Sequence, residues 1–228
     1  MPLRKVPLVQ GEIYHIYNRG NSKQKIFNSN EDFARFVRLL YLANGTSSLD
    51  LRVIKHSEAE PFNFERGEAQ VAIGAYCLMP NHFHILLTPL TDAGVGHFMR
   101  KLATGYSMYF NTKYRRTGSL FEGRFKSEHV AGNQYLKYLF AYIHLNPVKL
   151  FQADWREIGL LNVGAAQIFL NEYPYSSYLD NKVERPETAI LNRDMYPDYF
   201  TTQSDLNTEM VEWLTFHEQV VTTTKRST

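Results

Sequence analysis

The feature of this chain that most restricts its fold is a pair of apolar runs separated by only three residues. The runs cover residues 71–78 and 82–88, and residues 79–81 lie between them. Two such runs with a short Pro-Asn link are typical of a β-hairpin, because antiparallel strands can be joined by a tight turn. Alternate side chains of a strand leave the same face of a sheet, so His82 and His84 are expected to share one face.

Periodic segments on either side of this hairpin predict further strands and helices. Apolar alternation or helical spacing indicates strands over residues 11–18 and 120–130, helices over 30–44, 94–112 and 134–145, and a short strand over 51–54. Their order predicts an α+β fold, a ferredoxin-like antiparallel sheet with helices packed on one face. The periodicity weakens after residue 150. We therefore expect one domain over 1–150 and a loop-rich, partly helical C-terminal extension over 151–228, with a helix at 207–220.

The length and composition indicate a globular protein. Its 228 residues are 44% hydrophobic and 21% charged, which excludes disordered and collagen-like chains. No stretch approaches eighteen uncharged apolar residues and no apolar signal core follows the N-terminus, so we expect a cytoplasmic protein without a membrane partner. Cys77 is the only cysteine, which excludes an internal disulfide and a thiolate zinc cage.

Basic residues are concentrated in one segment, although the net charge of the chain is only +2. Between residues 97 and 150, nine Lys and Arg residues stand against two Glu residues. Aromatic side chains are interleaved with these charges, and such a pairing is typical of single-stranded nucleic-acid binding. A solvated helix face with aromatic residues in the core remains an alternative. The helical spacing of Tyr106, Tyr109 and Phe110 favours core packing over base stacking.

Two histidines and a tyrosine are the residues most capable of chemistry. Two imidazoles on one strand face can bind one divalent ion, or they can form local hydrogen bonds instead. Tyr142 and Asn146 lie one turn apart on the expected helix 134–145, where a phenol could act as nucleophile and an amide oxygen could complete a metal shell. Tyr135 and Tyr138 lie on the same helix, so spacing alone does not select the nucleophile.

Several motifs occur in an order that resembles a known family. They are Tyr14-His15-Ile16 with Arg19-Gly20-Asn21, the segment 79–87 with its His-Phe-His core, Gly105-Tyr106, residues 118–126, residues 142–149, and residues 173–178. This set is similar to the HUH single-tyrosine transposases, and among them to the REP-associated tyrosine transposases and their insertion-sequence relatives. The resemblance covers residues 6–178.

The resemblance implies a catalytic domain over residues 1–150 that binds single-stranded or hairpin DNA, as a monomer or homodimer. It implies cleavage by a tyrosine, which leaves a 5′-phosphotyrosine link and a free 3′-hydroxyl. His82 and His84 match the metal ligands, Tyr142 the nucleophile, and Asn146 the third ligand, where relatives often have glutamine. The metal would be Mg²⁺ or Mn²⁺. We expect phosphate contacts from basic residues of these motifs and their neighbours: Arg19, Arg115, Arg116, Arg124, Lys126 and Lys149.

Two other functions remain open at this stage. The His pair could activate water in a metal-dependent phosphodiesterase, although the strands around it offer no further carboxylate or histidine ligand. The same sheet could also belong to a domesticated, catalytically inactive protein that binds hairpin nucleic acid. Only the tyrosine mechanism leaves DNA covalently attached to the protein.

Overall fold

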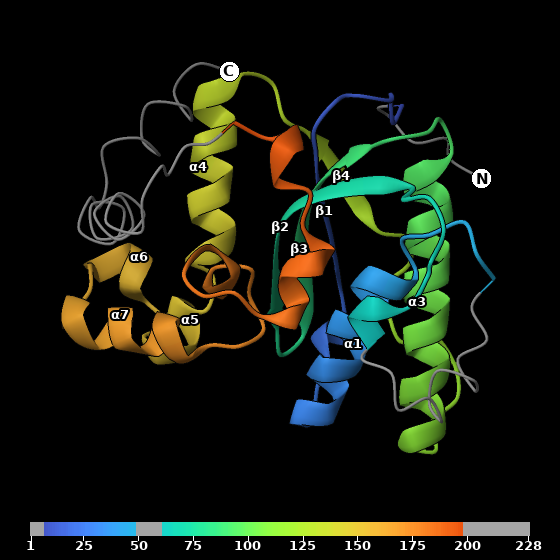
Figure 1. Cartoon of the computed structure of the whole chain (residues 1–228). Helices are drawn as coiled ribbons and strands as arrows, with labels where there is room; N and C mark the ends of the chain where they lie inside the picture. The colour runs from blue at the N-terminus through green and yellow to red at the C-terminus, as the bar shows by residue number, and fades with distance from the viewer. Residues whose placement is uncertain (1–6, 49–60, 198–228) are drawn as a thin grey trace.

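A four-stranded antiparallel sheet forms the centre of the protein. The computed structural model describes residues 7–48 and 61–197 (Figure 1). The strand order is β2-β3-β1-β4, and the strands are β1 (Tyr14–Arg19), β2 (Val71–Met79), β3 (His82–Pro89) and β4 (Lys126–His129). Neighbours pair antiparallel throughout. The α+β class, the ferredoxin-like order of elements and the 79–81 turn are confirmed.

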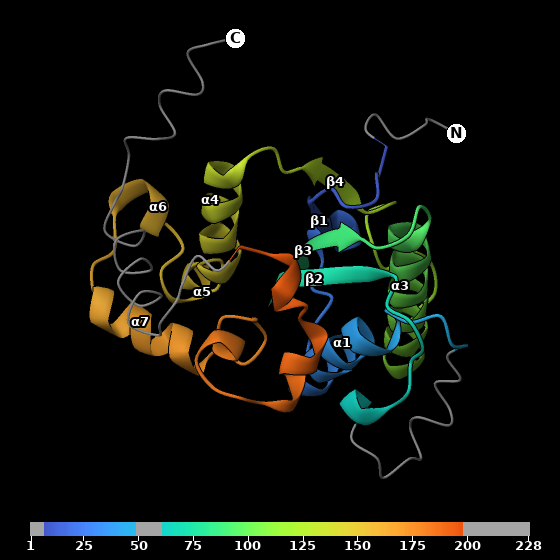
Figure 2. The same cartoon turned by 45° about the horizontal axis from the view of Figure 1, so that its top comes forward.

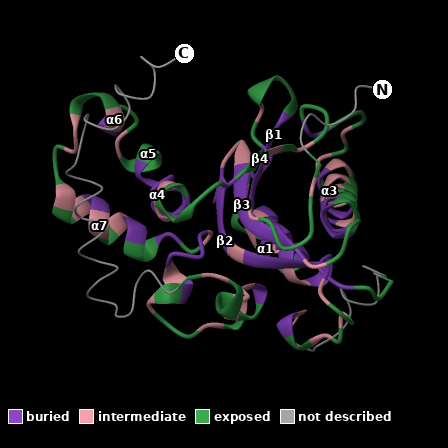
Figure 3. Ribbon diagram, turned by 90° about the horizontal axis from the view of Figure 1, so that it is seen from above, coloured by how far each residue is buried: buried purple, intermediate pink, exposed green. Residues whose placement is uncertain are grey.

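The helices cover both faces of the sheet. Helices α1 (Asn30–Leu42) and α3 (Gly94–Lys113) pack on one face, and α4 (Asn133–His144) packs on the other (Figures 1 and 2). The expectation that the helices share one face is therefore wrong. The reason is that the sheet is apolar on both sides: Phe83 and Ile85 belong to the α1–α3 core, whereas Leu86 belongs to the α4 core. Figure 3 shows β2 and β3 buried between the two layers.

A buried carboxylate joins the start of α1 to the end of α3. Asp32 is fully buried and accepts hydrogen bonds from Lys113 Nζ at 2.8 Å and Tyr114 OH at 2.7 Å. Burial alone would raise the pKa of Asp32, but these hydrogen bonds outweigh it and hold the pKa below its ordinary value. Tyr106 and Phe110 of α3 are buried, as their spacing predicted, and are not available for base stacking.

The segment after α4 returns to the outer edge of β2. It forms α5 (Val148–Phe151), α6 (Trp155–Ile158) and α7 (Val163–Glu172), and later the 3-10 turns η3 (Leu179–Asn181), η4 (Pro186–Ile190) and η5 (Arg193–Met195). Leu78 N donates to Tyr175 O at 2.9 Å, and Asn192 N donates to Ile73 O at 2.9 Å. The described part of the C-terminal extension thus pairs with the sheet edge that β2 would otherwise expose. The division of the chain at residue 150 stays a prediction.

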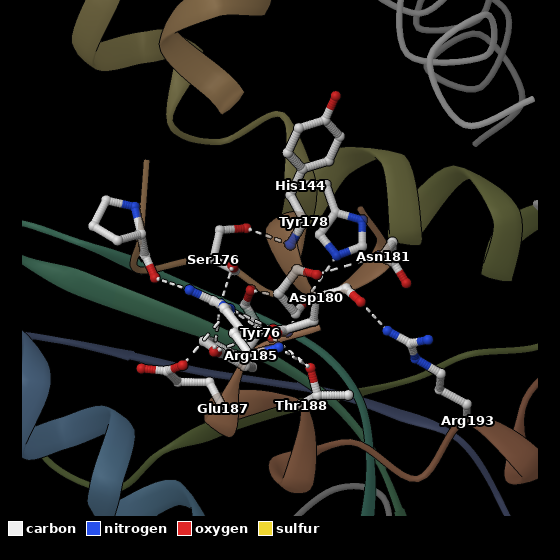
Figure 4. A network of polar contacts seen from close by, with 12 residues as sticks. Tyr76, His144, Ser176, Tyr178, Asp180, Asn181, Arg185, Glu187, Thr188 and Arg193 are labelled. Atoms are coloured by element: carbon white, nitrogen blue, oxygen red, sulfur yellow. Dashed lines mark hydrogen bonds and ion pairs between the residues drawn. The ribbon is translucent and has the colours of Figure 1, made fainter. Parts of the chain in front are cut away.

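A network of hydrogen bonds and ion pairs holds the segment after α4 against β2 and the end of α4 (Figure 4). Asp180 is fully buried and forms an ion pair with Arg185 Nε at 2.6 Å, and Arg185 Nη2 also donates to the Tyr76 hydroxyl of β2 at 3.2 Å. At the end of α4, His144 Nε2 lies 2.8 Å from Ser177 Oγ. Both the sheet and α4 are therefore tied to the same returning segment.

Some expected elements differ in extent or lie outside the description. The strand expected over 120–130 is confined to β4, because Gly118 and Gly123 adopt positive φ angles of 83° and 72° and turn the chain before it. The strand expected at 51–54 and the helix expected at 207–220 lie outside the described residues. Within 7–48 and 61–197, no helix has the length and apolarity needed to cross a membrane.

Candidate active site at the start of β3

Both histidines follow the hairpin turn and lie on the face of the sheet that α4 covers. β3 begins at His82, and its pleat sends His82 and His84 to the same side, with ring centroids 5.0 Å apart. In the central strand β1, Arg19 is opposite His82 and Tyr17 is opposite His84. The predicted shared face of the two histidines is confirmed. Their roles as ligands stay a prediction.

One ring nitrogen of His84 has a hydrogen-bond partner, and the other has none among the described residues. Its Nδ1 lies 2.8 Å from Nε2 of His15, which the sequence analysis had placed in a motif without a role. Its Nε2 is buried and has no hydrogen-bond partner among the described residues. Burial, together with the nearby His15 and His82, holds the pKa of His84 well below its ordinary value, so the ring is neutral. A neutral imidazole can bind a metal ion through such a nitrogen when that nitrogen carries no proton.

His82 is arranged in a similar way. Its Nδ1 lies 2.6 Å from Oδ1 of Asn81, the last residue of the turn. An amide oxygen can only accept, so Nδ1 carries the proton and Nε2 is left with its lone pair. Burial, and then the charges of Lys149 and Arg19, lowers the pKa of His82 to about 4. An outer hydrogen bond that fixes the ring is characteristic of metal-binding histidines.

The described residues supply no carboxylate as a third ligand beside the two histidines. Among the described residues there is no cluster of three or more His, Cys, Asp or Glu side chains that could hold a metal ion. Asn146 is buried, and its Nδ2 donates to the Tyr142 carbonyl at 2.9 Å, so only its Oδ1 could coordinate. Two imidazoles, one amide oxygen and water molecules are a donor set that fits a divalent cation such as Mn²⁺.

Of the three α4 tyrosines, Tyr142 lies against the histidines. Its ring centroid is 5.6 Å from that of His84 and 6.2 Å from that of His15. Tyr138 packs on Tyr142 at 6.1 Å, and Tyr135 stacks on Tyr138 at 6.1 Å, so the three rings form a row. The geometry favours Tyr142 among the candidates that spacing could not separate.

Tyr17 is a further phenol near the pair that the sequence analysis had not considered. Its ring centroid is 6.1 Å from that of His84. Its hydroxyl donates to Glu128 Oε1 at 2.7 Å. Burial, and then the Glu128 carboxylate, raises the pKa of Tyr17 to about 12. Tyr17 is therefore held protonated, which disfavours it as a nucleophile.

Arg156 of α6 is a second side chain at this site that sequence reasoning missed. Its guanidinium carbon lies 4.6 Å from the Tyr142 ring centroid, within the range of a cation–π contact. It is also among the charges that lower the pKa of His84, after burial and the nearer groups. No local motif marks Arg156, because its contact with Tyr142 depends on how α6 folds back after α4.

A cavity of about 420 Å³ opens beside His82. It is lined by residues of β1, the 3-10 turn η1 (Asn21–Lys23), the hairpin turn, the start of β3, the segment before β4 and the start of β4. These are Tyr17, Asn18, Arg19, Lys23, Asn81, His82, Glu122 and Lys126. Three of these are cations, and Arg19 forms an ion pair with Glu122. The cavity is thus a basic, partly aromatic recess that reaches one of the two histidines.

The six predicted phosphate contacts do not all lie in one place. Arg19 and Lys126 line the cavity, and Lys149 is close enough to lower the pKa of His82 after burial. Arg116 donates to Gln24 Oε1 at 2.9 Å, next in sequence to Lys23 of the cavity wall. Arg115 and Arg124 are exposed in the connections after α3 and before β4. Their roles in binding DNA stay predictions.

Comparison with known proteins agrees with the resemblance seen in the sequence. The family described as "Transposase IS200 like" matches residues 54–146, a segment that contains both histidines, Tyr142 and Asn146 but neither His15 nor Arg156. The resemblance to the single-tyrosine transposases is thereby confirmed for that segment. No curated protein matches the chain.

Solved structures with a similar chain include one described as "Structure of the REP associates tyrosine transposase bound to a REP hairpin". The two chains share 14% sequence identity, with a TM-score of 0.47, over 89% of this chain and 93% of the other. A likeness at this level assigns neither a ligand nor an activity to the present protein.

Proposed function

From the premise that this chain carries an IS200-like transposase segment, we propose that it is a metal-dependent DNA strand transferase that cleaves and rejoins single-stranded or hairpin DNA through Tyr142. The observation that carries the proposal is the packing of the Tyr142 ring on His84, whose Nε2 is buried and has no hydrogen-bond partner among the described residues. The ring of the candidate nucleophile and the ring of a candidate metal ligand are thereby adjacent, on elements that come from separate parts of the chain.

His82, His84 and the Asn146 amide oxygen would hold the cation, Mg²⁺ or Mn²⁺. When bound, such an ion polarises a nonbridging phosphate oxygen and stabilises the charge that develops during displacement. Histidine ligands favour Mn²⁺, because Mg²⁺ prefers oxygen donors. The protein's own contribution is to keep both imidazoles neutral and oriented through His15 and Asn81.

Tyr142 would attack the scissile phosphorus through its hydroxyl oxygen. A bond forms between that oxygen and phosphorus, the bond from phosphorus to the 3′ oxygen breaks, the phenol loses its proton to solvent, and the 3′ oxygen gains one. The phosphodiester is conserved as a tyrosyl ester, so rejoining needs no nucleotide cofactor. Arg156, over the Tyr142 ring, would stabilise the phenolate as it forms.

Basic side chains around the site suit a DNA strand. Arg19, Lys23 and Lys126 line the cavity beside His82, whose volume of about 420 Å³ is within the range that ligand pockets occupy. Tyr17 adds an aromatic wall on which a base could stack. We propose that the strand next to the scissile phosphate runs through this cavity, and that the remaining predicted cations contact phosphates outside it.

Replacement of the tyrosines tests the proposal directly. Incubation of the protein with labelled single-stranded hairpin DNA and Mn²⁺ should give a covalent complex that survives SDS. Tyr142→Phe should abolish this complex, with a stability change below about 1 kcal/mol because the ring is kept. Tyr138→Phe, one turn earlier on the same helix, is the matched control and should still form it.

The same experiment separates the rival functions. Cleavage without an adduct would identify a phosphodiesterase that uses water. Tight, metal-independent binding with neither cleavage nor adduct would identify an inactive hairpin-binding protein. An adduct on Tyr142→Phe protein, or a nucleotide mapped to another tyrosine, would refute the assignment of the nucleophile.

A further inference from the structure

Two buried histidines, one of them the proposed metal ligand His84, share one hydrogen bond. His15 of β1 and His84 of β3 are both buried, with rings stacked at 18° and centroids 5.0 Å apart. The contact joins Nε2 of His15 to Nδ1 of His84 at 2.8 Å. A neutral imidazole carries one proton, so one ring must donate in this bond and the other must accept. The direction of the bond decides whether His84 Nε2 is bare or protonated.

The two directions differ in what His15 presents on its other side. If His84 Nδ1–H donates, His15 carries its proton on Nδ1 and His84 Nε2 is bare. If His15 Nε2–H donates, His15 Nδ1 is a bare lone pair and His84 is protonated on Nε2, where it could not bind a metal ion.

The position of Glu128 in β4 favours one of these two hydrogen-bond directions over the other. Its Oε2 lies 3.9 Å from His15 Nδ1, and the strand register places Glu128 directly opposite His15. Its Oε1 accepts the Tyr17 hydroxyl at 2.7 Å, which restrains the carboxylate. A negative charge facing His15 Nδ1 favours a proton on that nitrogen and disfavours a lone pair there. The favoured arrangement runs from Glu128 through His15 to His84.

We propose that Glu128 and His15 are positioning residues that hold His84 as its Nδ1–H tautomer, so that Nε2 is bare where the metal is bound. The role of this tautomer in metal binding rests on the proposed function, but the tautomer itself is a property of the metal-free protein. His82 obtains the same tautomer from Asn81, so both imidazoles are set by neighbours in the sheet and its turn.

The tautomer can be read from imidazole ¹⁵N shifts in the metal-free, full-length protein, with His84 assigned through His84→Gln. We expect a protonated Nδ1 and an unprotonated Nε2 on His84. Glu128→Gln removes the charge from an exposed position, and its amide N–H could donate toward His15 Nδ1 instead. This variant should move His84 toward the Nε2–H tautomer. A wild-type His84 that is protonated on Nε2 would overturn the proposal.

Metal affinity gives a second measurement, with Mn²⁺ binding followed by electron paramagnetic resonance. His15→Phe keeps a ring but removes the acceptor, and should weaken Mn²⁺ binding about 10–100-fold, as for other outer-shell partners of metal ligands. His15→Gln restores an acceptor oxygen and should recover part of the affinity. Equal affinity in the wild type and His15→Phe would overturn the proposal.

A second histidine–carboxylate pair provides the matched control. His129 Nε2 lies 2.7 Å from Glu12, and His129 contacts Tyr14, whose ring belongs to the α1–α3 core. Glu12→Gln and His129→Phe should leave Mn²⁺ affinity unchanged. Wild-type protein that binds no Mn²⁺ and forms no DNA adduct would refute the proposed function, whereas the ¹⁵N spectrum would still decide the tautomer of His84.

Discussion

Removal of the Arg156 charge should slow formation of the tyrosyl–DNA link without removing the nucleophile. The perturbation is Arg156→Met, which keeps an unbranched apolar side chain against Trp155 and Tyr142 but carries no charge. Arg156 lies in α6, after the segment that matches the transposase family, and its guanidinium carbon is 4.6 Å from the Tyr142 ring centroid. Its contribution therefore comes from the C-terminal extension, outside the matched segment.

The expected magnitude follows from this distance. If the guanidinium-to-centroid distance of 4.6 Å is taken as the shortest separation of the two charges, they interact by at most about 4 kcal/mol at an effective dielectric of about 20, and by about 1 kcal/mol in bulk water. Arg156 is half-buried, so solvent screens part of the larger figure. A loss of about 1–2 kcal/mol of transition-state stabilisation corresponds to a rate that falls about 5–30-fold. The ground-state cation–π contact should cost about 1 kcal/mol of stability at most.

The assay is single-turnover adduct formation at saturating DNA and Mn²⁺, which separates the chemical step from binding. Arg156→Lys keeps the charge and should recover most of the rate. Arg38→Met, an exposed arginine on α1 across the sheet, is the control for general loss of positive charge. Wild-type rates for Arg156→Met, or an equal loss in Arg38→Met, would refute the electrostatic role of Arg156.

Three further outcomes are expected. His82→Ala should abolish metal-dependent cleavage and leave most DNA affinity, measured by fluorescence anisotropy, because phosphate contacts supply that affinity; equal cleavage in chelator and in Mn²⁺ would contradict this. With six phosphate contacts, a plot of the logarithm of the affinity for single-stranded DNA against the logarithm of the salt concentration should have a slope of about -4. An affinity that does not change with salt would show that the basic residues of the 97–150 segment are only a solvated surface. Asp32→Asn should cost about 1–3 kcal/mol in urea unfolding at pH 7, because it removes the buried carboxylate that pairs with Lys113 and accepts from Tyr114, although Lys113 keeps its contact with Glu31. Since the folded pKa of Asp32 is lowered, its contribution is present above its unfolded pKa and is lost as pH falls through the folded one, so the cost should shrink near pH 3.

The local parts of the fold could be predicted from the sequence because short-range periodicity determines them. The hairpin, the helices α1, α3 and α4, and the shared face of His82 and His84 all depend on residues within a few positions of one another. Helical spacing leaves Tyr142, Tyr138 and Tyr135 as candidates, and the ring contact with His84 favours Tyr142.

The layer of α4 could not be predicted in the same way. Leu136, Leu139 and Ile143 give α4 an apolar face, but amphipathicity says only that a helix packs, not on which side of a sheet. The side bearing the histidines also carries Ala75 and Leu86, which supply an apolar surface for α4. A sheet with two apolar faces requires helices on both, and that inference needs the whole strand set together.

Residues after position 150 contribute to the site, although no sequence motif identifies them. They supply Arg156 over Tyr142, and through Ser177 they bind the end of the helix that carries this tyrosine. The Asp180–Arg185 pair then fixes the same segment to Tyr76 in β2, the strand paired with β3. The position of Tyr142 relative to the histidines thus depends on a chain of contacts from β3 to β2, from β2 to the returning segment, and from that segment to α4. Short-range sequence patterns predict the individual elements. They do not predict how these elements contact one another, because some of the contacts join residues about a hundred positions apart.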